Sequence, residues 1–496
     1  MDAGQSRRIL AAVALATFMT YLDNNIVNVA LPTIERQLQL SVAGLEWVVS
    51  AYVLVFAGLL LVGGRLADAF GRRRLFLTGL TIFTAASLAS GLAGNVDLLI
   101  ASRAVQGFGA ALVTPTTLAI ISASFTDTRG RNAAVGAWQA VGALALALGP
   151  VLGGVISQHL SWGWIFLLNV PIGVGTLALG ARAIPESREA TARRLDLPGL
   201  ATSALALFAL TYALIEGPHL GWTAPIIVTS FAAAVLAGVA FVRVEARTAN
   251  PMVALTLFRN RVFAGGSVAL MMWAFGLFGI YFFTSLYLQE VLGFSPTKAG
   301  LAFVPMALLM VVGAIASERV ARTIGAHRSV GGAMVLMAAG IASVGLLGKS
   351  AGFAELMPSF AAIGVGGGLT TPLTATVLGE MPAEQAGVAS GIFNASREVA
   401  GLLGITVIGA ILTARESALL RQGHPAATAF LSGYQIGLAV AAILVAAGGL
   451  AAWTALRHTH QREATPGVAP VQPQPGEVAS LPAFEVVADG AGQPSA

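Results

Sequence analysis

Apolar residues occur along this chain in long stretches that alternate with short polar or charged segments. Each stretch approaches the roughly 20 residues that a helix needs to cross about 30 Å of hydrocarbon. The pattern therefore predicts fourteen transmembrane helices, at 9–31, 44–64, 75–94, 96–121, 131–157, 162–183, 197–215, 223–243, 262–288, 298–316, 329–347, 355–379, 387–413 and 430–454. The first stretch follows Arg7 and Arg8 as a signal peptide would, but it continues to Leu31 without a cleavage site, so it is predicted to be a retained helix.

The composition supports an all-α integral membrane protein and excludes several other classes. Charged residues make up 10% of the 496 residues, against about 25% in an ordinary soluble protein. The mean hydropathy is +0.79, too apolar for a globule of this size. The absence of cysteine excludes disulfides, thiol nucleophiles and cysteine-ligated metals. The net charge of +5 is spread between apolar stretches and forms no basic patch for nucleic acid.

Positive charge alternates between successive predicted loops. Of the 28 Lys and Arg residues, 21 fall in loops and tails on the side of the N-terminus, five fall on the other side and two lie inside predicted helices. Cytoplasmic loops of membrane proteins carry the excess of Lys and Arg. Both termini are therefore predicted to be cytoplasmic.

One internal repeat divides the chain. The segment 65–74 and the segment 319–328 share the same pattern of basic, apolar and glycine residues. The two segments follow the second and the tenth predicted helix, an offset that is explained by two six-helix bundles separated by an inserted hairpin. The predicted units are a first bundle at 1–190, the hairpin with its linker at 191–250, a second bundle at 251–460 and a disordered tail at 461–496.

Two charged residues lie within apolar helices. Asp23 lies in the first helix, where a carboxylate costs at least ~2.5–3.5 kcal/mol and must face a cavity or a partner. Arg103 lies in the fourth helix and supplies a permanent positive charge. Asp23 is a candidate proton carrier, and the alternative is a carboxylate with a purely structural role. For Arg103 the alternative is a structural or snorkelling arginine. Arg397 and Glu398 form either a second ionic element or a structural pair.

Two further motifs suggest moving parts. The loop after the second helix combines Gly64, Asp68 and Gly71 with a run of three arginines at 72–74. Such a loop can hold helix ends together through ion pairs and helix dipoles. The alternative is that its arginines serve only to set the membrane topology. Arg72, Arg73 and Arg74 form that run. In the fifth helix, Gly149, Pro150, Gly153 and Gly154 combine a kink with small residues, which let another backbone approach closely and rock; a generic glycine packing motif is the alternative.

Together these motifs resemble the major facilitator superfamily, specifically its 14-helix branch of drug/proton antiporters, over about residues 7 to 455. The segment 64–74 resembles the family signature after helix 2, and 103–110 resembles its arginine motif in helix 4. The segment 22–32 resembles the helix 1 motif of this branch, and the glycines at 149–154 resemble the helix 5 motif associated with export. Asn25 stands where the branch usually has threonine, and Gly163 stands where it usually has arginine.

The resemblance implies proton-coupled efflux of a hydrophobic or amphipathic drug or antibiotic across a bacterial cytoplasmic membrane by alternating access. The ligands would be protons and a small molecule, without a cofactor or a metal, and the unit would be a monomer in the lipid bilayer. Asp23 and Arg103 would couple protons, and the loop after helix 2 would stabilise the outward-facing state when helix 2 meets helix 11. The candidate substrate cavity comprises Asn24, Asn25, Asn28, Gln106, Trp273, Phe278 and Tyr281, although packing or lipid-facing roles are the alternative for the aromatic residues.

Other functions remain open at this stage. An importer or facilitator of the same fold, and a non-transporting membrane sensor, are the alternatives to an exporter. An enzyme is disfavoured because the chain has no zinc-protease motif, no nucleophile elbow and no phosphate loop.

Overall fold

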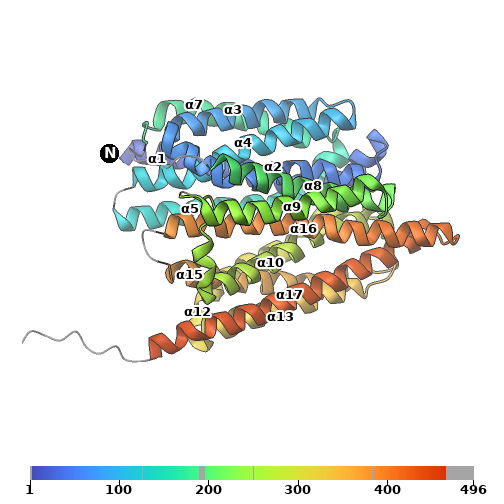
Figure 1. The fold of residues 1–496 in the computed structure, drawn as a ribbon. Helices are drawn as coiled ribbons and strands as arrows, with labels where there is room; N and C mark the ends of the chain where they lie inside the picture. Colours follow the sequence, from blue (N-terminus) through green and yellow to red (C-terminus); the bar gives the residue numbers. More distant parts are fainter. Residues whose placement is uncertain (1–2, 126, 189–195, 250, 382–384, 465–496) are drawn as a thin grey trace, which may run out of the picture.

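The computed structural model describes residues 3–125, 127–188, 196–249, 251–381 and 385–464. These residues form helices and contain no strand, and fourteen helical segments in them are long and apolar enough to cross a membrane. The predicted all-α class and the helix count are therefore confirmed. Figure 1 shows the helices running roughly side by side, with their ends at two opposite faces of the molecule.

The first bundle contains α1 to α7. Its helices are α1 (Ala3–Leu38), α2 (Val42–Phe70), α3 (Arg72–Gly91), α4 (Val96–Ser124), α5 (Thr128–His159), α6 (Trp164–Leu167) and α7 (Asn169–Ala183). Helix α4 packs against both α2 and α3, and α1 packs along α5. In this arrangement α1 and α4 lie in the interior of the bundle, which is where the chain carries its two intramembrane charges.

The second bundle contains α10 to α17. Its elements are α10 (Arg261–Leu286), the π-helical turn η2 (Tyr287–Val291), α11 (Pro296–Ala302), α12 (Val304–Ile324), α13 (Ala326–Gly345), α14 (Phe353–Leu369), α15 (Pro372–Gly379), α16 (Ala386–Arg421) and α17 (Ala426–Ala464). Helix α17 packs against α10 and α13, and α16 packs against α10. Helix α16 also packs against α2, and α11 packs against α5, so these two pairs join the bundles.

A helical hairpin links the two bundles. It consists of α8 (Leu197–Leu220) and α9 (Pro225–Arg247) and is followed by the short 3₁₀ helix η1 (Leu255–Arg259). Helix α8 contacts α2 and α16, whereas α9 packs mainly on α8 (Figure 1). Asp196 begins α8 as its N-cap, because its carboxylate accepts a hydrogen bond from the Gly199 N–H.

Several predicted boundaries need correction. Helices α1, α16 and α17 extend beyond the apolar stretches, because backbone hydrogen bonding continues past the last apolar residue. Three predicted helices are broken, near Leu168, Phe303 and Thr370. Prolines at the first turn of α12 and α15 account for two of the breaks, since proline cannot donate the helical hydrogen bond. Helix α17 continues to Ala464, past the predicted tail boundary at 461, and residues 465–496 lie outside the described residues.

The internal repeat is visible in the backbone. Gly71 ends α2 with φ of 107°, and Gly325 ends α12 with φ of 87°. Residues with a side chain rarely adopt these positive φ values, so glycine is required at both turns. The segments 65–74 and 319–328 thus form the same helix-turn-helix corner in the two bundles.

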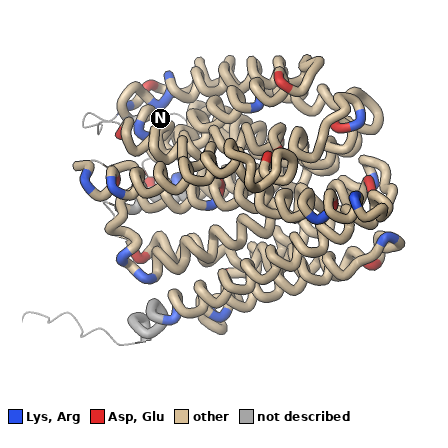
Figure 2. The backbone as a smooth tube through the Cα atoms, turned by 45° about the vertical axis from the view of Figure 1, so that its right-hand side comes forward, with Lys and Arg blue, Asp and Glu red and all other residues tan. Residues whose placement is uncertain are grey.

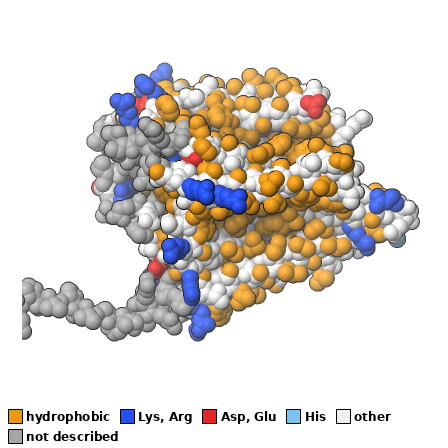
Figure 3. Space-filling model, viewed as in Figure 1, with side chains coloured by type: hydrophobic (Ala, Val, Ile, Leu, Met, Phe, Trp, Pro, Cys, Tyr) orange, Lys and Arg blue, Asp and Glu red, His pale blue; other side chains and the backbone are white. Residues whose placement is uncertain are grey.

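Charge is distributed along the helix axes in the way a membrane protein requires. We call the end that holds the α2–α3 turn at Gly71 the basic end, and the end that holds the α5–α6 turn at Leu160 the opposite end. Lys and Arg lie mainly toward the ends of the helices, and hydrophobic side chains cover the middle of the face that Figure 3 shows (Figures 2 and 3). The apolar middle is suited to the hydrocarbon of a bilayer.

We predict that the basic end is cytoplasmic. A reporter enzyme fused after Arg457 should be active in the cytoplasm, and a reporter inserted near His219 should be active outside it, because Lys and Arg concentrate in the loops of the basic end. Reporter activity on the reverse sides, or both reporters on one side, would contradict this topology.

Candidate functional site

The carboxylate of Asp23 lies in the interior of the first bundle, with none of its surface exposed. Its Oδ2 accepts a hydrogen bond from Arg103 Nη1 at 2.5 Å, which is also an ion pair. Its Oδ1 accepts hydrogen bonds from Gln106 Nε2 at 2.7 Å and from Asn169 Nδ2 at 2.8 Å. Three side-chain donors therefore satisfy the charge, as a buried carboxylate requires.

The guanidinium of Arg103 is equally buried and is held from several sides. Its Nη1 also donates to Gln106 Oε1 at 2.7 Å, and its Nε donates to the Val48 carbonyl oxygen at 3.1 Å. The guanidinium carbon lies 4.3 Å from the ring centre of Tyr52 and 5.5 Å from that of Phe166, both cation–π distances. Its Nη2 has no hydrogen-bond partner, so one donor of the group is left unsatisfied in the interior.

Gln106 joins the pair to a third helix. Its Nε2 donates to the Ser87 Oγ at 2.8 Å as well as to Asp23, so α1, α3 and α4 meet at this amide. With Val48 on α2 and Asn169 on α7, the polar network draws on five helices. A buried ion pair by itself contributes little net stability, because desolvating two charges offsets their attraction. The network therefore fixes the arrangement of these helices.

The sequence anticipated part of this network. Asp23 and Arg103 were predicted to share a role in proton coupling, and the structure shows that they form an ion pair. Gln106 was predicted to line a possible substrate cavity, which stays a prediction; its side chain is buried and bonds to Asp23. Asn169 was not singled out, although an asparagine within an apolar segment is the kind of residue that seeks a buried polar partner.

The glycines of α5 make close contacts with two other helices. A Cβ on Gly149 would lie 2.7 Å from Asn25 Cβ, and one on Gly153 would overlap the Ile26 carbonyl oxygen, so α5 lies against α1 just beyond Asp23. On the other side, a Cβ on Gly154 would overlap the Pro296 carbonyl oxygen of α11. Gly300 of α11 in turn lies against the Pro150 carbonyl oxygen. The motif therefore joins α1 to the contact between the bundles.

The predicted latch loop is anchored to the end of α7. The Glu186 carboxylate accepts hydrogen bonds from the N–H groups of Arg73 and Arg74, both at 3.2 Å, and so caps the N-terminus of α3. Arg72 N–H donates to the Ser187 carbonyl oxygen at 2.9 Å. These contacts stay within the first bundle, and Glu186 was not predicted. The side chain of Asp68 lies outside the described residues.

Helix α2 meets the second bundle along α16. A Cβ on Gly391 would lie 3.0 Å from Leu61 Cδ2, and Gly64 packs toward Pro115 of α4 in the same part of α2. The ion pair of Arg397 and Glu398 also lies on α16, with Arg397 Nη2 donating to Glu398 Oε1 at 2.6 Å. The Glu398 side chain is buried and its Oε2 has no hydrogen-bond partner.

The remaining residues predicted for a cavity lie on α1 and α10. Tyr281 is buried against Phe303 with ring centres 5.2 Å apart, and Phe278 packs on Gly401 of α16. Trp273 lies near Gly367 of α14. On α1, Asn25 donates to the Tyr21 carbonyl oxygen at 2.7 Å; Asn28 is buried and Asn24 is half-buried. A shared cavity for these residues stays a prediction.

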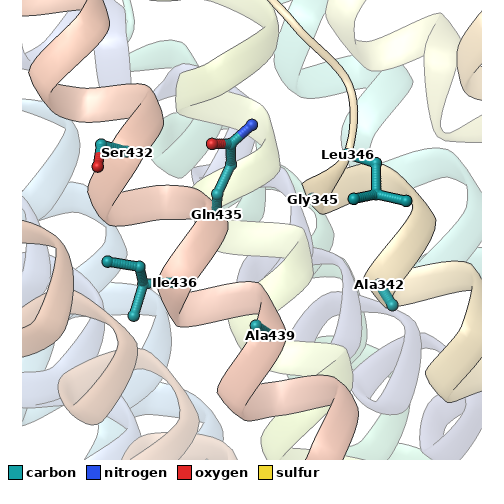
Figure 4. A pocket seen from close by; sticks show the side chains of 7 residues that line it. All are labelled: Ala342, Gly345, Leu346, Ser432, Gln435, Ile436 and Ala439. Carbon is teal, nitrogen blue, oxygen red and sulfur yellow. The ribbon is translucent and has the colours of Figure 1, made fainter.

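A groove of about 480 Å³ lies elsewhere, between α13 and α17 at the opposite end (Figure 4). It is lined by Ala342, Gly345, Leu346, Ser432, Gln435, Ile436 and Ala439. None of the residues predicted for substrate binding lines it. In the described part of the chain, no three His, Asp or Glu side chains group as metal ligands.

We predict that the Asp23–Arg103 pair obeys the energetics of a buried ion pair. Asp23→Asn and Arg103→Gln should each lower the free energy of unfolding by ~3–5 kcal/mol, because each leaves one uncompensated buried charge. The double variant should recover most of this loss, and thermal unfolding in detergent measures all three. Additive losses in the double variant would contradict the pairing.

We also predict that Gly153 is required for the contact between α1 and α5. Gly153→Ala should cost about 1–3 kcal/mol of stability, because its Cβ would overlap the Ile26 carbonyl oxygen. Gly136→Ala in the same helix is the matched control, since nothing lies within 4 Å of the position that its Cβ would occupy and no loss is expected there. Equal thermal stability of the two variants would show that the close contact is not needed.

Comparison with known proteins identifies the family. The sequence profile described as the Major Facilitator Superfamily matches residues 13–405. The chain is 35% identical to the methylenomycin A resistance protein of Streptomyces coelicolor, over 92% of this chain and 93% of that protein. It is 39% identical to the cephamycin export protein CmcT of Amycolatopsis lactamdurans, over 80% of this chain and 83% of that protein.

Solved structures agree on the fold. A bacterial homologue of the human lysosomal transporter Spinster, in an inward-facing and unoccupied conformation, matches with a TM-score of 0.66 at 16% identity, over 93% of this chain and 99% of that one. The peptide-transporter-family structure PepTSo matches with a TM-score of 0.66 at 16% identity, over 92% of this chain and 99% of that one. At these identities the likeness concerns the fold alone.

Proposed function

The chain belongs to the Major Facilitator Superfamily, and we propose that it exports a hydrophobic or amphipathic small molecule, a drug or antibiotic, in exchange for protons. It is a multi-pass membrane protein and not an enzyme. The names of its relatives, a methylenomycin A resistance protein and a cephamycin export protein, support export over import. The exchange would proceed by alternating access, in which the two bundles rock about a shared site.

The observation that carries the proposal is the buried ion pair of Asp23 and Arg103. Arg103 keeps its charge at all physiological pH values, whereas a carboxylate can be neutralised by one proton. Protonation of Asp23 would remove the charge that compensates Arg103 in a medium of low dielectric constant. The two helices would then have to rearrange, and proton binding would be coupled to the position of α1 relative to α4.

Helix α1 connects this event to the contact between the bundles. Just beyond Asp23 it packs on the α5 glycines, and α5 in turn packs on α11 of the second bundle. Near its end, the Val29 carbonyl oxygen accepts a hydrogen bond from Gln289 Nε2 at 2.9 Å, which is another contact between the bundles. A shift of α1 would thus change both its contact with α5 and its contact with Gln289, which supports a role for Asp23 in alternating access.

The proposed setting is a bacterial cytoplasmic membrane, with both termini in the cytoplasm and a monomer as the working unit. In this topology the loop at 64–74 acts as a latch on the cytoplasmic side. The anchoring of α3 through Glu186 supports that role, because it holds the loop while α2 moves against α16.

The membrane potential supplies enough energy for the exchange. One elementary charge crossing 100 mV releases about 2.3 kcal/mol. At ~1.4 kcal/mol per tenfold change, this sustains a gradient of roughly 50-fold for a neutral substrate exchanged for one proton.

We predict that Asp23→Asn abolishes uphill export and leaves substrate binding in place, because asparagine imitates the neutral acid and cannot release a proton. Everted vesicles with an imposed pH gradient should accumulate substrate with the unchanged protein and show no accumulation with the variant, at equal amounts of folded protein. Asp97→Asn, which changes an exposed acid in the first turn of α4, is the control and should transport normally. Accumulation by Asp23→Asn at the unchanged rate would reject Asp23 as the coupling acid.

A further inference from the structure

A second acid is buried at the contact between the bundles and plays no part in the Asp23 network. Glu46 lies in the second turn of α2, toward the opposite end, and only 2% of its surface is exposed. Its Oε2 is buried and has no hydrogen-bond partner. An ionised carboxylate in such a place would lose its hydration without gaining a donor, a cost that a proton removes.

The carboxyl group is inserted into the second bundle. A Cβ on Gly409 of α16 would overlap Glu46 Oε1 and would lie 2.7 Å from its Oε2, so the carboxyl group occupies the space that the glycine leaves free. Helices α2 and α16 belong to different bundles, and their contact must change when the bundles rock. The burial of Glu46 therefore exists only while this part of the contact is closed.

No cation compensates the group in the described part of the chain. Glu216, at the end of α8, is the acid of the hairpin that reaches this part of α2. Glu216 is held in place by Trp47, whose Nε1 donates to its Oε1 at 2.9 Å. On α16 the residue that faces Glu46 is Gly409, with Arg415 and Glu416 farther along that helix toward its end.

We propose that Glu46 is a second proton-binding carboxyl, distinct from Asp23, which takes up a proton whenever the α2–α16 contact closes at the opposite end. The neutral acid fits against Gly409, whereas the carboxylate requires water and favours separation of the two helices. Glu216, presented by the inserted hairpin, raises the proton affinity of the site. In the proposed topology this end faces the outside, so an external proton would favour closure there, which is the step that returns an exporter to its inward-facing state.

The test follows the distance between the bundles at the opposite end as a function of pH. The chain has no cysteine, so spin labels can be placed at Leu160→Cys and Leu346→Cys alone. Both side chains are exposed, and they end α5 of the first bundle and α13 of the second. Electron-paramagnetic-resonance distances are recorded in nanodiscs between about pH 5 and pH 9, the range over which buried carboxyl groups titrate. No substrate or gradient is present, so the result does not depend on export.

The expected result is a population with a short distance that increases as the pH falls. Glu46→Gln, which imitates the protonated acid, should keep the short distance dominant over the whole range. Glu216→Gln should move the transition to lower pH, because it removes the negative charge that favours protonation. Glu355→Gln, which changes an exposed glutamate at the same end, is the matched control and should leave the transition unchanged.

To separate the titration of Glu46 from that of Asp23, the distance measurements are repeated in a protein that carries both Asp23→Asn and Arg103→Gln. Any pH transition that remains in this protein must come from another group. The proposal is overturned if Glu46→Gln shows the same transition as its parent in both backgrounds. It is also overturned if Glu216→Gln moves the transition to higher pH. Proton-coupled export that persists in Asp23→Asn, together with a pH transition that Glu46→Gln abolishes, would instead contradict the role of Asp23 alone.

Discussion

The ion pair of Asp23 and Arg103 is the interaction on which the first bundle depends. Two opposite charges in a membrane interior are tolerated only because they lie 2.5 Å apart and because Gln106, Asn169 and a backbone carbonyl oxygen complete their hydrogen bonds. Satisfying all of these groups requires α1, α2, α3, α4 and α7 to meet at one level. In the mechanism we propose, a proton neutralises Asp23 and not Arg103, so the interaction that orders the bundle is also the one that proton binding disrupts.

Small residues determine how this centre reaches the rest of the molecule. Gly153 brings α5 against α1, and Gly154 brings the same helix against α11, so one short segment touches both bundles. Gly409 has the corresponding role on α16, where its missing side chain admits the carboxyl group of Glu46. Both contacts are packed closely and without spare volume, and such contacts change between discrete arrangements more readily than they deform.

The sequence was sufficient for the helix count, the repeat and the two intramembrane charges, because hydropathy, glycine turns and buried ions leave local patterns. Gly71 and Gly325, for example, mark the same corner in both bundles. Asn169, Glu46 and Glu186 escaped prediction because their importance depends on which helices become neighbours, and hydropathy carries no information on helix pairing. Gln106 shows the same limit, since its polarity was recognised and its partner was not. Helix ends differed because helices continue into polar sequence until a cap or proline stops them.

The central claim is that Asp23 exists in two protonation states within the folded protein. Infrared difference spectroscopy tests it directly, because a protonated carboxyl group has a carbonyl stretching band that its carboxylate lacks. As the pH is lowered, the folded protein should gain a component of this band at the frequency of a carboxyl group shielded from water; Asp23→Asn should remove that component, whereas Asp97→Asn should change only the absorption of hydrated acids, because Asp97 is exposed. An identical band in Asp23→Asn and in the unchanged protein would show that Asp23 does not titrate, and would contradict the account.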